Sequence, residues 1–241
     1  MGVGPGDPEL LTVAAVRAIA AASLVAYPVA EPGAAGMAAC IAAPWIDADQ
    51  QRLPLHFPMV EAAEPRRHAW QAAADALAQA VAAGQAVVLL CEGDSSLYAS
   101  CSYVLLALSE RHPGCRLRVL PGISAVSAAA AAACAIGIAW PLALQREALL
   151  IRPTPEQPIE LEALLDQAAA SGTVLALLKL GRRWPWVRAL LQRRGLLEKA
   201  LFARRVGWED EQLAPALQVE AEVQPYFSLL LIRQSWPEVL P

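Results

Sequence analysis

The sequence predicts an α/β protein of two α/β domains with the active cleft between them. Short apolar segments, typical of buried strands, alternate with longer segments that have a helical spacing of apolar residues. The alternation restarts after Trp140-Pro141, and glycine-bearing polar loops follow several strands, where ligands bind in open α/β sheets. We therefore expect an N-terminal domain over residues 1–119 with a parallel sheet, and a C-terminal domain over residues 120–241 with a mixed sheet.

Composition excludes several classes of protein. The 241 residues are 56% hydrophobic and 17% charged, which favours a sizeable folded core over disorder. The net charge of −4 gives no general attraction to nucleic acid or to an anionic membrane, and neither is expected as a partner. Five cysteines without a CxxC pair, and three scattered histidines, suggest neither disulfides nor a protein-bound metal. We expect a reducing, cytoplasmic setting, since no signal peptide is evident.

The first half opens with a glycine-rich loop over residues 1–7, before a helix predicted over about Glu9–Ala22. The loop has the spacing G-x-G-P-G-D, not the G-x-G-x-x-G of dinucleotide-binding proteins, and Asp7 would repel phosphate. Only Met1–Val3 precede it, so little of a first strand is expected there.

A strand is predicted over Ser23–Val29, followed by a loop-like stretch over residues 31–65. Within that stretch the segment LPLHFPM, residues 53–59, contains two prolines and cannot join a central strand. It is either an extended apolar flap that lines a pocket or a plain connecting loop. A helix over Pro65–Ala83 ends at Gly84.

The central stretch of this half is AVVLLCEGDSSLYAS, residues 86–100. Its five apolar residues predict a buried parallel strand, and an acidic loop follows before a helix over about Ser96–Arg111. Carboxylates in that loop argue against a phosphate and for a hydroxylated or cationic ligand. The alternative is that Asp94 or Ser95 only caps the following helix. A further strand over Arg116–Leu120 leads through the loop 121–125 into a helix over Ala125–Ala135.

The uncharged segment from Val119 to Gln145 raises the question of a membrane span. It is mostly Ala and Ser and is broken by Pro and Gly, so we interpret it as a buried, Ala-rich helix between loops.

The second half repeats the strand and helix alternation. The predicted strands are 148–152, 173–178, 199–206 and 226–232, and the predicted helices are 159–170 and 185–194.

Three loops carry a resemblance to a known family. GVGPGDPELLT at 2–12, CEGDSSLYAS at 91–100 and PGISAVSAAAA at 121–131 each lie between a strand and a helix. In that order and spacing they resemble the tetrapyrrole methylases, the S-adenosylmethionine-dependent methyltransferases that build cobalamin and sirohaem. The resemblance covers essentially the whole chain. The segments LPLHFPM, EGDSSLYAS and LLKLGR (177–182) resemble most the branch that methylates carbon 20 of precorrin-2 or of cobalt-factor II.

The resemblance implies that S-adenosylmethionine binds folded between two domains of a homodimeric enzyme whose substrate is a tetrapyrrole. The implied cofactor contacts are Pro5, Glu92, Gly93, Asp94, Leu97, Ser124, Ala125, Leu178, Gly207 and Ser228. Leu178 stands where the family often has Met, and Ser95 replaces the Pro of its Gly-Asp-Pro.

Substrate and proton-transfer residues follow from the same resemblance. The expected substrate contacts are His56, Phe57, Met59, Arg182 and Arg204, since Arg binds carboxylates bidentately. A structural salt bridge is the alternative for the arginines. A proton must leave the methylated carbon, and the candidate acceptors are Glu92, Tyr98 and His56, or equally solvent.

Other functions stay open at this point. A sibling that methylates another precorrin or uroporphyrinogen III would carry similar loops. An RNA or protein methyltransferase of the same fold is disfavoured, for RNA by the net charge of −4. A non-enzymatic or dinucleotide-binding module is disfavoured by the poor glycine fingerprint.

Overall fold

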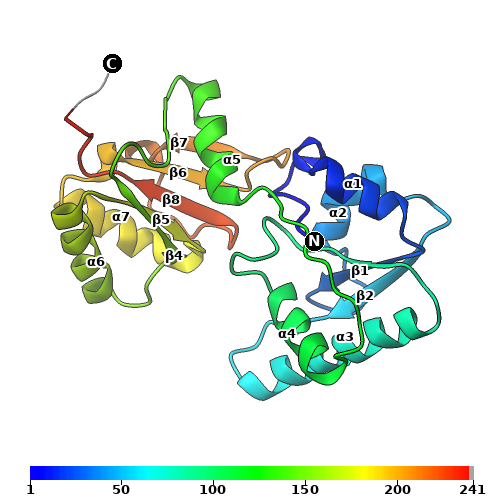
Figure 1. Ribbon diagram of the computed structural model, residues 1–241. Coiled ribbons are helices and arrows are strands. Elements are labelled where there is room, and N and C mark those ends of the chain that lie inside the picture. The colour runs from blue at the N-terminus through cyan, green and yellow to red at the C-terminus, as the bar shows by residue number, and fades with distance from the viewer. Residues whose placement is uncertain (239–241) are drawn as a thin grey trace. The chain divides into compact units, whose positions relative to one another are not determined.

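The computed structural model describes residues 1–238 and divides into two compact units, Met1–Ser124 (unit 1) and Ala125–Pro241 (unit 2). Each unit is an α/β structure with its own sheet (Figure 1). This architecture confirms the predicted α/β class. Within residues 1–238, no helix combines the length and the apolar character that crossing a membrane requires. The uncharged segment that raised this question contains only the eight-residue helix α5, Ala125–Ala132.

Unit 1 contains a three-stranded parallel sheet in the order β2-β1-β3. Its strands are β1 (Leu24–Val29), β2 (Gln51–His56) and β3 (Val87–Leu89). Its helices are α1 (Val13–Ala20), α2 (Met37–Ala42), α3 (Ala63–Ala82) and α4 (Cys101–Arg111). The predictions of β1, α3 and β3 are confirmed to within a few residues.

The stretch 31–65 is not mostly loop, as predicted, because it contains both α2 and β2. Pro54 lies inside β2, paired with Tyr27 of β1. Since β2 is an edge strand, a residue without an N–H group is tolerated there. The prediction that the segment 53–59 joins no central strand is therefore confirmed, whereas its description as a flap or plain loop is wrong for residues 53–56, which lie in β2.

Two predicted helix starts are wrong. The first helix does not begin at Glu9, because residues Pro8–Leu10 form a short 3₁₀ turn capped by Asp7. Helix α1 begins at Val13 and is capped by Thr12, whose hydroxyl accepts a hydrogen bond from the Ala15 N–H. Likewise α4 begins at Cys101 and not at Ser96. Neither Asp94 nor Ser95 caps α4, since the residue before it, Ser100, makes no side-chain cap.

The predicted strand Arg116–Leu120 is not a member of the sheet. In Figure 1 this segment is a plain ribbon without an arrow, following α4. The first residues of the chain lie beside it, since the Gly2 N–H donates to the Leu120 carbonyl at 3.1 Å. On its other side Gly2 forms an isolated parallel bridge with Cys91. Met1–Val3 thus extend alongside the end of β3.

Unit 2 contains a five-stranded mixed sheet in the order β4-β5-β8-β6-β7. Its strands are β4 (Ala148–Pro153), β5 (Thr173–Leu178), β6 (Ala200–Arg204), β7 (Gln212–Pro215) and β8 (Ser228–Ile232). Helices α6 (Pro158–Ser171) and α7 (Trp184–Arg193) accompany α5. The four predicted strands and two predicted helices of this half are confirmed, and β7 was missed.

The core of unit 2 is formed by α6, α7 and one face of the sheet. Trp184 and Phe202 are fully buried in it, with their ring centroids 5.2 Å apart. Helix α6 has Pro158 in its first turn and ends at Gly172 in the left-handed conformation, both of which suit these residue types. The smaller core of unit 1 is built on β1, β2, α3 and α4.

Candidate functional site

Three glycines from distant parts of unit 1 meet at backbone distance. A side-chain carbon added to Gly2 would lie 2.4 Å from the Gly93 carbonyl oxygen, and one added to Gly122 would lie 2.3 Å from that same oxygen. Gly93 has a φ of 66°, and a Cβ added to it would meet nothing within 4 Å. We call Gly2, Gly93 and Gly122 the glycine junction. It leaves open space beside Gly93, where a ligand can approach the backbone.

Hydrogen bonds fix the loops around the junction. The N–H and carbonyl of Gly4 pair with those of Gly93, at 3.2 and 2.7 Å. The Asp94 carboxylate accepts bonds from the Gly122 N–H at 2.8 Å and from the N–H and hydroxyl of Ser96. Burial alone would raise the pKa of Asp94, but these bonds outweigh it and lower that pKa. Asp94 therefore stays ionised and ties two of the loops together.

Ser95 has an equally structural position. Its side chain is buried and its hydroxyl donates to the Leu120 carbonyl at 2.8 Å. This bond joins the second loop to the stretch that leads into the third. The first and second expected cofactor loops, with Pro5, Glu92, Gly93, Asp94 and Leu97, are thus brought together with the start of the third.

Glu92 lies three residues after β3, and its carboxylate accepts a hydrogen bond from the Ala38 N–H at 3.2 Å. Burial raises the pKa of Glu92, with backbone hydrogen bonds opposing the shift only in part. Glu92 therefore holds a proton more readily than an exposed carboxyl does.

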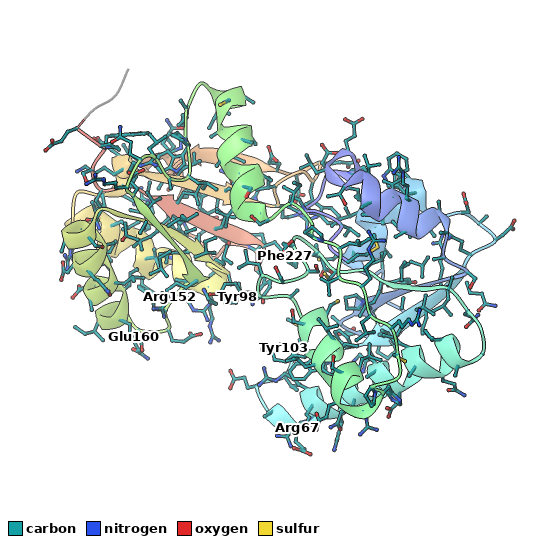
Figure 2. All side chains as sticks on the ribbon, viewed as in Figure 1. Arg67, Tyr98, Tyr103, Arg152, Glu160 and Phe227 are labelled. Carbon is teal, nitrogen blue, oxygen red and sulfur yellow. The ribbon has the colours of Figure 1, made fainter. Side chains whose placement is uncertain are left out.

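Tyr98 and His56 differ in their settings. Tyr98 is half exposed on the second loop (Figure 2). Its φ of 54° lies in the left-handed region, which a right-handed helix does not use, so α4 does not start before it. His56 is the exposed last residue of β2, paired with Val29. Strands β2 and β3 both run parallel to β1, one on each side of it, so their carboxyl ends lie at the same end of the sheet. His56 is the last residue of β2, and Glu92 follows β3 by three residues.

The other residues of the segment 53–59 take separate positions. Phe57 is buried in the core of unit 1, whereas the Met59 side chain is 74% exposed. Packing accounts for Phe57 in this structure, and Met59 remains accessible.

In unit 2 the expected cofactor residues Leu178, Gly207 and Ser228 lie at or just beyond one end of the strands β5, β6 and β8, which we call the strand-end edge of the sheet. Leu178 ends β5, opposite Leu229 of β8, next to Ser228. The buried Ser228 hydroxyl accepts a bond from the Gly181 N–H and donates one to the Pro225 carbonyl. Gly207, with a φ of 82°, follows β6 and donates its N–H to the Glu211 carboxylate at 2.6 Å. Ser228 therefore shapes the edge through its hydrogen bonds.

The two substrate arginines of this edge are not equivalent. Arg204 ends β6 opposite Ser228, and its Nε is buried without a hydrogen-bond partner among residues 1–238. Arg182 is 74% exposed and lies 3.9 Å from Glu156, which also pairs with Arg183. Arg204 thus presents an unsatisfied cationic donor, as a carboxylate-binding residue would.

Sequence reasoning did not single out Gly2 and Gly122 as site residues, or the bond from Ala38 to Glu92. The glycines in the first and third loops were visible, but glycine occurs in many turns, and only the fold shows which of them touch. Ser124 and Ala125 lie at the end of unit 1 and the start of α5, respectively.

Comparison with known proteins adds the family. The model for Tetrapyrrole (Corrin/Porphyrin) Methylases matches residues 1–220. A precorrin-2 C(20)-methyltransferase from Sinorhizobium sp is 31% identical over 240 residues, covering 96% of this chain and 93% of that protein. A cobalt-precorrin-2 C(20)-methyltransferase from Salmonella typhimurium is 29% identical, covering 98% of this chain and 95% of that protein.

Solved structures agree with the fold. The cobalt precorrin-4 methyltransferase CbiF has a TM-score of 0.69 at 21% identity, covering 97% of this chain and 92% of that one. A uroporphyrin-III C-methyl transferase from Thermus thermophilus, complexed with S-adenosyl homocysteine, has a TM-score of 0.60 at 21% identity, covering 97% and 95%.

Proposed function

The chain belongs to the tetrapyrrole methylase family. From that membership we propose that it is an S-adenosylmethionine-dependent methyltransferase of cobalamin biosynthesis that acts on carbon 20 of precorrin-2 or of its cobalt-containing counterpart. The observation that carries the proposal is the likeness to the Sinorhizobium precorrin-2 C(20)-methyltransferase over 93% of that protein. The Salmonella relative, named for the cobalt substrate, is matched to a similar extent, so both substrates are retained.

The glycine junction supports a place for S-adenosylmethionine. The open space beside Gly93 allows a ligand to lie against the backbone, and the ionised Asp94 favours positive charge or hydroxyl groups nearby. When bound, the cofactor supplies an electrophilic methyl group. The loops around Gly93 contribute a fixed surface that orients the ligand, because their backbones are already held by hydrogen bonds to one another.

Arg204 is proposed to bind a carboxylate of the tetrapyrrole. Its buried Nε has no partner among the described residues, so an acidic side chain of the substrate would satisfy it. Replacement by Lys keeps the charge but loses the fork of donors. We expect R204K to raise the KM for the tetrapyrrole about tenfold and to leave S-adenosylmethionine affinity unchanged. R193K, at an arginine whose side chain is 63% exposed and that is outside the proposed site, is the matched control.

Glu92 is proposed as the proton acceptor among the three candidates. Its pKa is raised by burial, so its carboxylate is a better base than an exposed one. E92Q keeps an acceptor for the Ala38 N–H and removes the base. We expect kcat to fall about 100-fold. Equal rates for E92Q and wild type would assign the proton to Tyr98, His56 or solvent, which Y98F and H56A separate.

The reaction itself is tested by anaerobic incubation with precorrin-2 and, separately, with cobalt-factor II, each with methyl-labelled S-adenosylmethionine. Label at carbon 20 of one product supports the proposal and selects the substrate. Calorimetric cofactor binding without label in either product would overturn the position or the substrate. We further propose a homodimer that works in the cytoplasm without a protein-bound metal, which light scattering and elemental analysis of the purified protein test.

A further inference from the structure

Two buried cysteines frame the second expected cofactor loop. Cys91 is the first residue of that loop, and Cys101, directly after the loop, is the first residue of α4. Their side chains are 1% and 6% exposed, and both are free thiols. Of the other cysteines, Cys40 and Cys134 are exposed and Cys115 is half-buried. A single buried cysteine is ordinarily a small core residue, but two at the ends of one functional loop form a dithiol.

The two sulfur atoms lie close together. The Cys101 thiol donates to the Leu90 carbonyl at 3.2 Å, which places its sulfur beside the peptide bond that joins Leu90 to Cys91. The Cys91 thiol donates to the Met1 carbonyl at 3.4 Å. A hydrogen bond between the two thiols lowers the pKa of Cys91 in spite of its burial, and the same bond raises the pKa of Cys101. Cys91 is therefore the first of the two to become a thiolate, the form that reacts with oxidants.

We propose that Cys91 and Cys101 form a reversible disulfide that closes the second loop into a ring and lowers its affinity for S-adenosylmethionine. The disulfide follows from the position of the two thiols alone. The effect on affinity rests on the proposed function, because there this loop is expected to bind the cofactor. Oxidation would thus switch the site to a weakly binding form, and a dithiol reductant would restore it by thiol–disulfide exchange.

The oxidant that the chemistry requires is a hydroperoxide. The Cys91 thiolate attacks one peroxide oxygen and breaks the O–O bond, which gives a sulfenic acid and a hydroxide that takes up the proton lost by Cys91. The Cys101 sulfur then bonds to the Cys91 sulfur, and the sulfenic hydroxyl leaves with the Cys101 proton as water. With hydrogen peroxide, two thiols and one peroxide give one disulfide and two molecules of water.

A small oxidant can reach the pair through the loop itself. Ser96, Tyr98 and Ser100 are exposed, and residues 92–100 contain no helix. Exposed segments of this kind open locally at a small fraction of the free energy of global unfolding. Since hydrogen peroxide is little larger than water, opening of these few residues is sufficient for the reaction.

Closing the ring moves Cys91 against the contacts that hold the loop. Its backbone N–H and carbonyl are hydrogen-bonded to residues 1 and 3, at 3.0 and 2.9 Å. Two residues further on, the Gly93 carbonyl lies in the glycine junction, where there is no space for additional atoms. The sulfurs of Cys91 and Cys101 must leave their carbonyl acceptors to bond to each other, so the loop shifts at this closely packed point.

The disulfide is tested on the reduced full chain with a slight molar excess of hydrogen peroxide. The intact protein should lose the mass of two hydrogen atoms, and a proteolytic map should join the peptides that contain Cys91 and Cys101. C101S, whose hydroxyl can still donate to the Leu90 carbonyl, should form no disulfide within the chain. C115S is the matched control and should oxidise as wild type does. No bond, or a bond between other cysteines, would overturn the proposal.

The effect on the loop is measured on the oxidised and the reduced forms. The amides of Gly93 and Gly122, which donate to Gly4 and Asp94, should exchange about tenfold faster after oxidation. Calorimetry should show S-adenosylmethionine binding about tenfold weaker, and dithiothreitol should restore both values. Equal exchange and equal affinity in the two forms would overturn the proposal. A reduced protein that binds no S-adenosylmethionine would contradict the proposed function instead, and the disulfide map and amide exchange would still decide the inference.

Discussion

The two units of the chain differ in the contacts that hold them in place, which are mainly between side chains in unit 2 and mainly between backbone atoms at the site of unit 1. In unit 2 the order comes from side chains, since the central strand β8 is buried along its whole length and Trp184 and Phe202 fill the core beside it. In unit 1 the functional loops are ordered by backbone contacts at three glycines. Unit 2 should therefore be sensitive to atoms removed from side chains, and the site of unit 1 to atoms added to the backbone.

The largest effect is expected from removing a side chain in unit 2. Trp184 is fully buried, and its indole N–H donates to the Glu220 carbonyl at 2.7 Å. W184A should lower the free energy of unfolding by about 4 kcal/mol, measured by urea denaturation. The control is W236A, at a tryptophan that is 47% exposed, which should cost less than about 1 kcal/mol. Similar losses in both variants would contradict the assignment.

The buried ion pair of unit 2 gives the next largest effect. Glu147 accepts two hydrogen bonds from Arg233, whose side chain is 1% exposed. E147Q should cost about 3 kcal/mol at pH 7, because it leaves a buried cation unpaired. Burial alone would raise the pKa of Glu147, but Arg233 and the Leu144 N–H lower it. The pair therefore stabilises the fold above the unfolded pKa, and this stability is lost as pH falls through the folded pKa.

Adding one carbon at the glycine junction should damage unit 1. G122A places a Cβ 2.3 Å from the Gly93 oxygen, so a loop must move, at a cost of about 2 kcal/mol. Cofactor affinity measured by calorimetry should fall at least tenfold. G114A adds the same carbon where nothing lies within 4 Å, and its affinity should match wild type. An unaffected G122A would show that the loops tolerate separation.

The smallest effect contrasts a carboxyl of unit 1 with Glu147. Because burial raises the pKa of Glu92, its contribution to stability is complete below the unfolded pKa and is lost as pH rises through the folded pKa. Glutamine does not ionise, so E92Q avoids the stability that Glu92 loses when it ionises while buried, and it should stabilise the protein by about 1 kcal/mol above neutral pH. Thermal melts from acidic to alkaline pH give the measurement. If E92Q were less stable than wild type at alkaline pH, the predicted stabilisation would be wrong.

The same contrast explains what the sequence could predict. The apolar run of β5 predicts a strand and forms one, because β4 and β8 pair with it on both sides. Arg116–Leu120 has a similar pattern without a complete partner, and no strand forms. The start of α4 was misplaced because the backbone turns at Tyr98 and Asp94 bonds to Gly122, a contact over 28 residues that no local pattern contains.

The site divides in the same way. The positions of the loops after the strands followed from the alternation of elements, and the α/β class with them. Which side chains in those loops are accessible to a ligand could not be predicted from that alternation. The burial of Phe57 and the unpaired Nε of Arg204 depend on neighbours far away in the chain.

The glycine junction has a consequence for how this surface evolves and for how it can be redesigned. The loops are joined through backbone atoms and through the side chains of Asp94 and Ser95, so side chains outside these contacts are not needed to hold the loops in place. Tyr98 is exposed on the second loop, and libraries that vary its side chain should keep a folded scaffold. A side chain at position 2 or 122 would displace the Gly93 carbonyl, so ligand preference can diverge around the frame that these two glycines maintain.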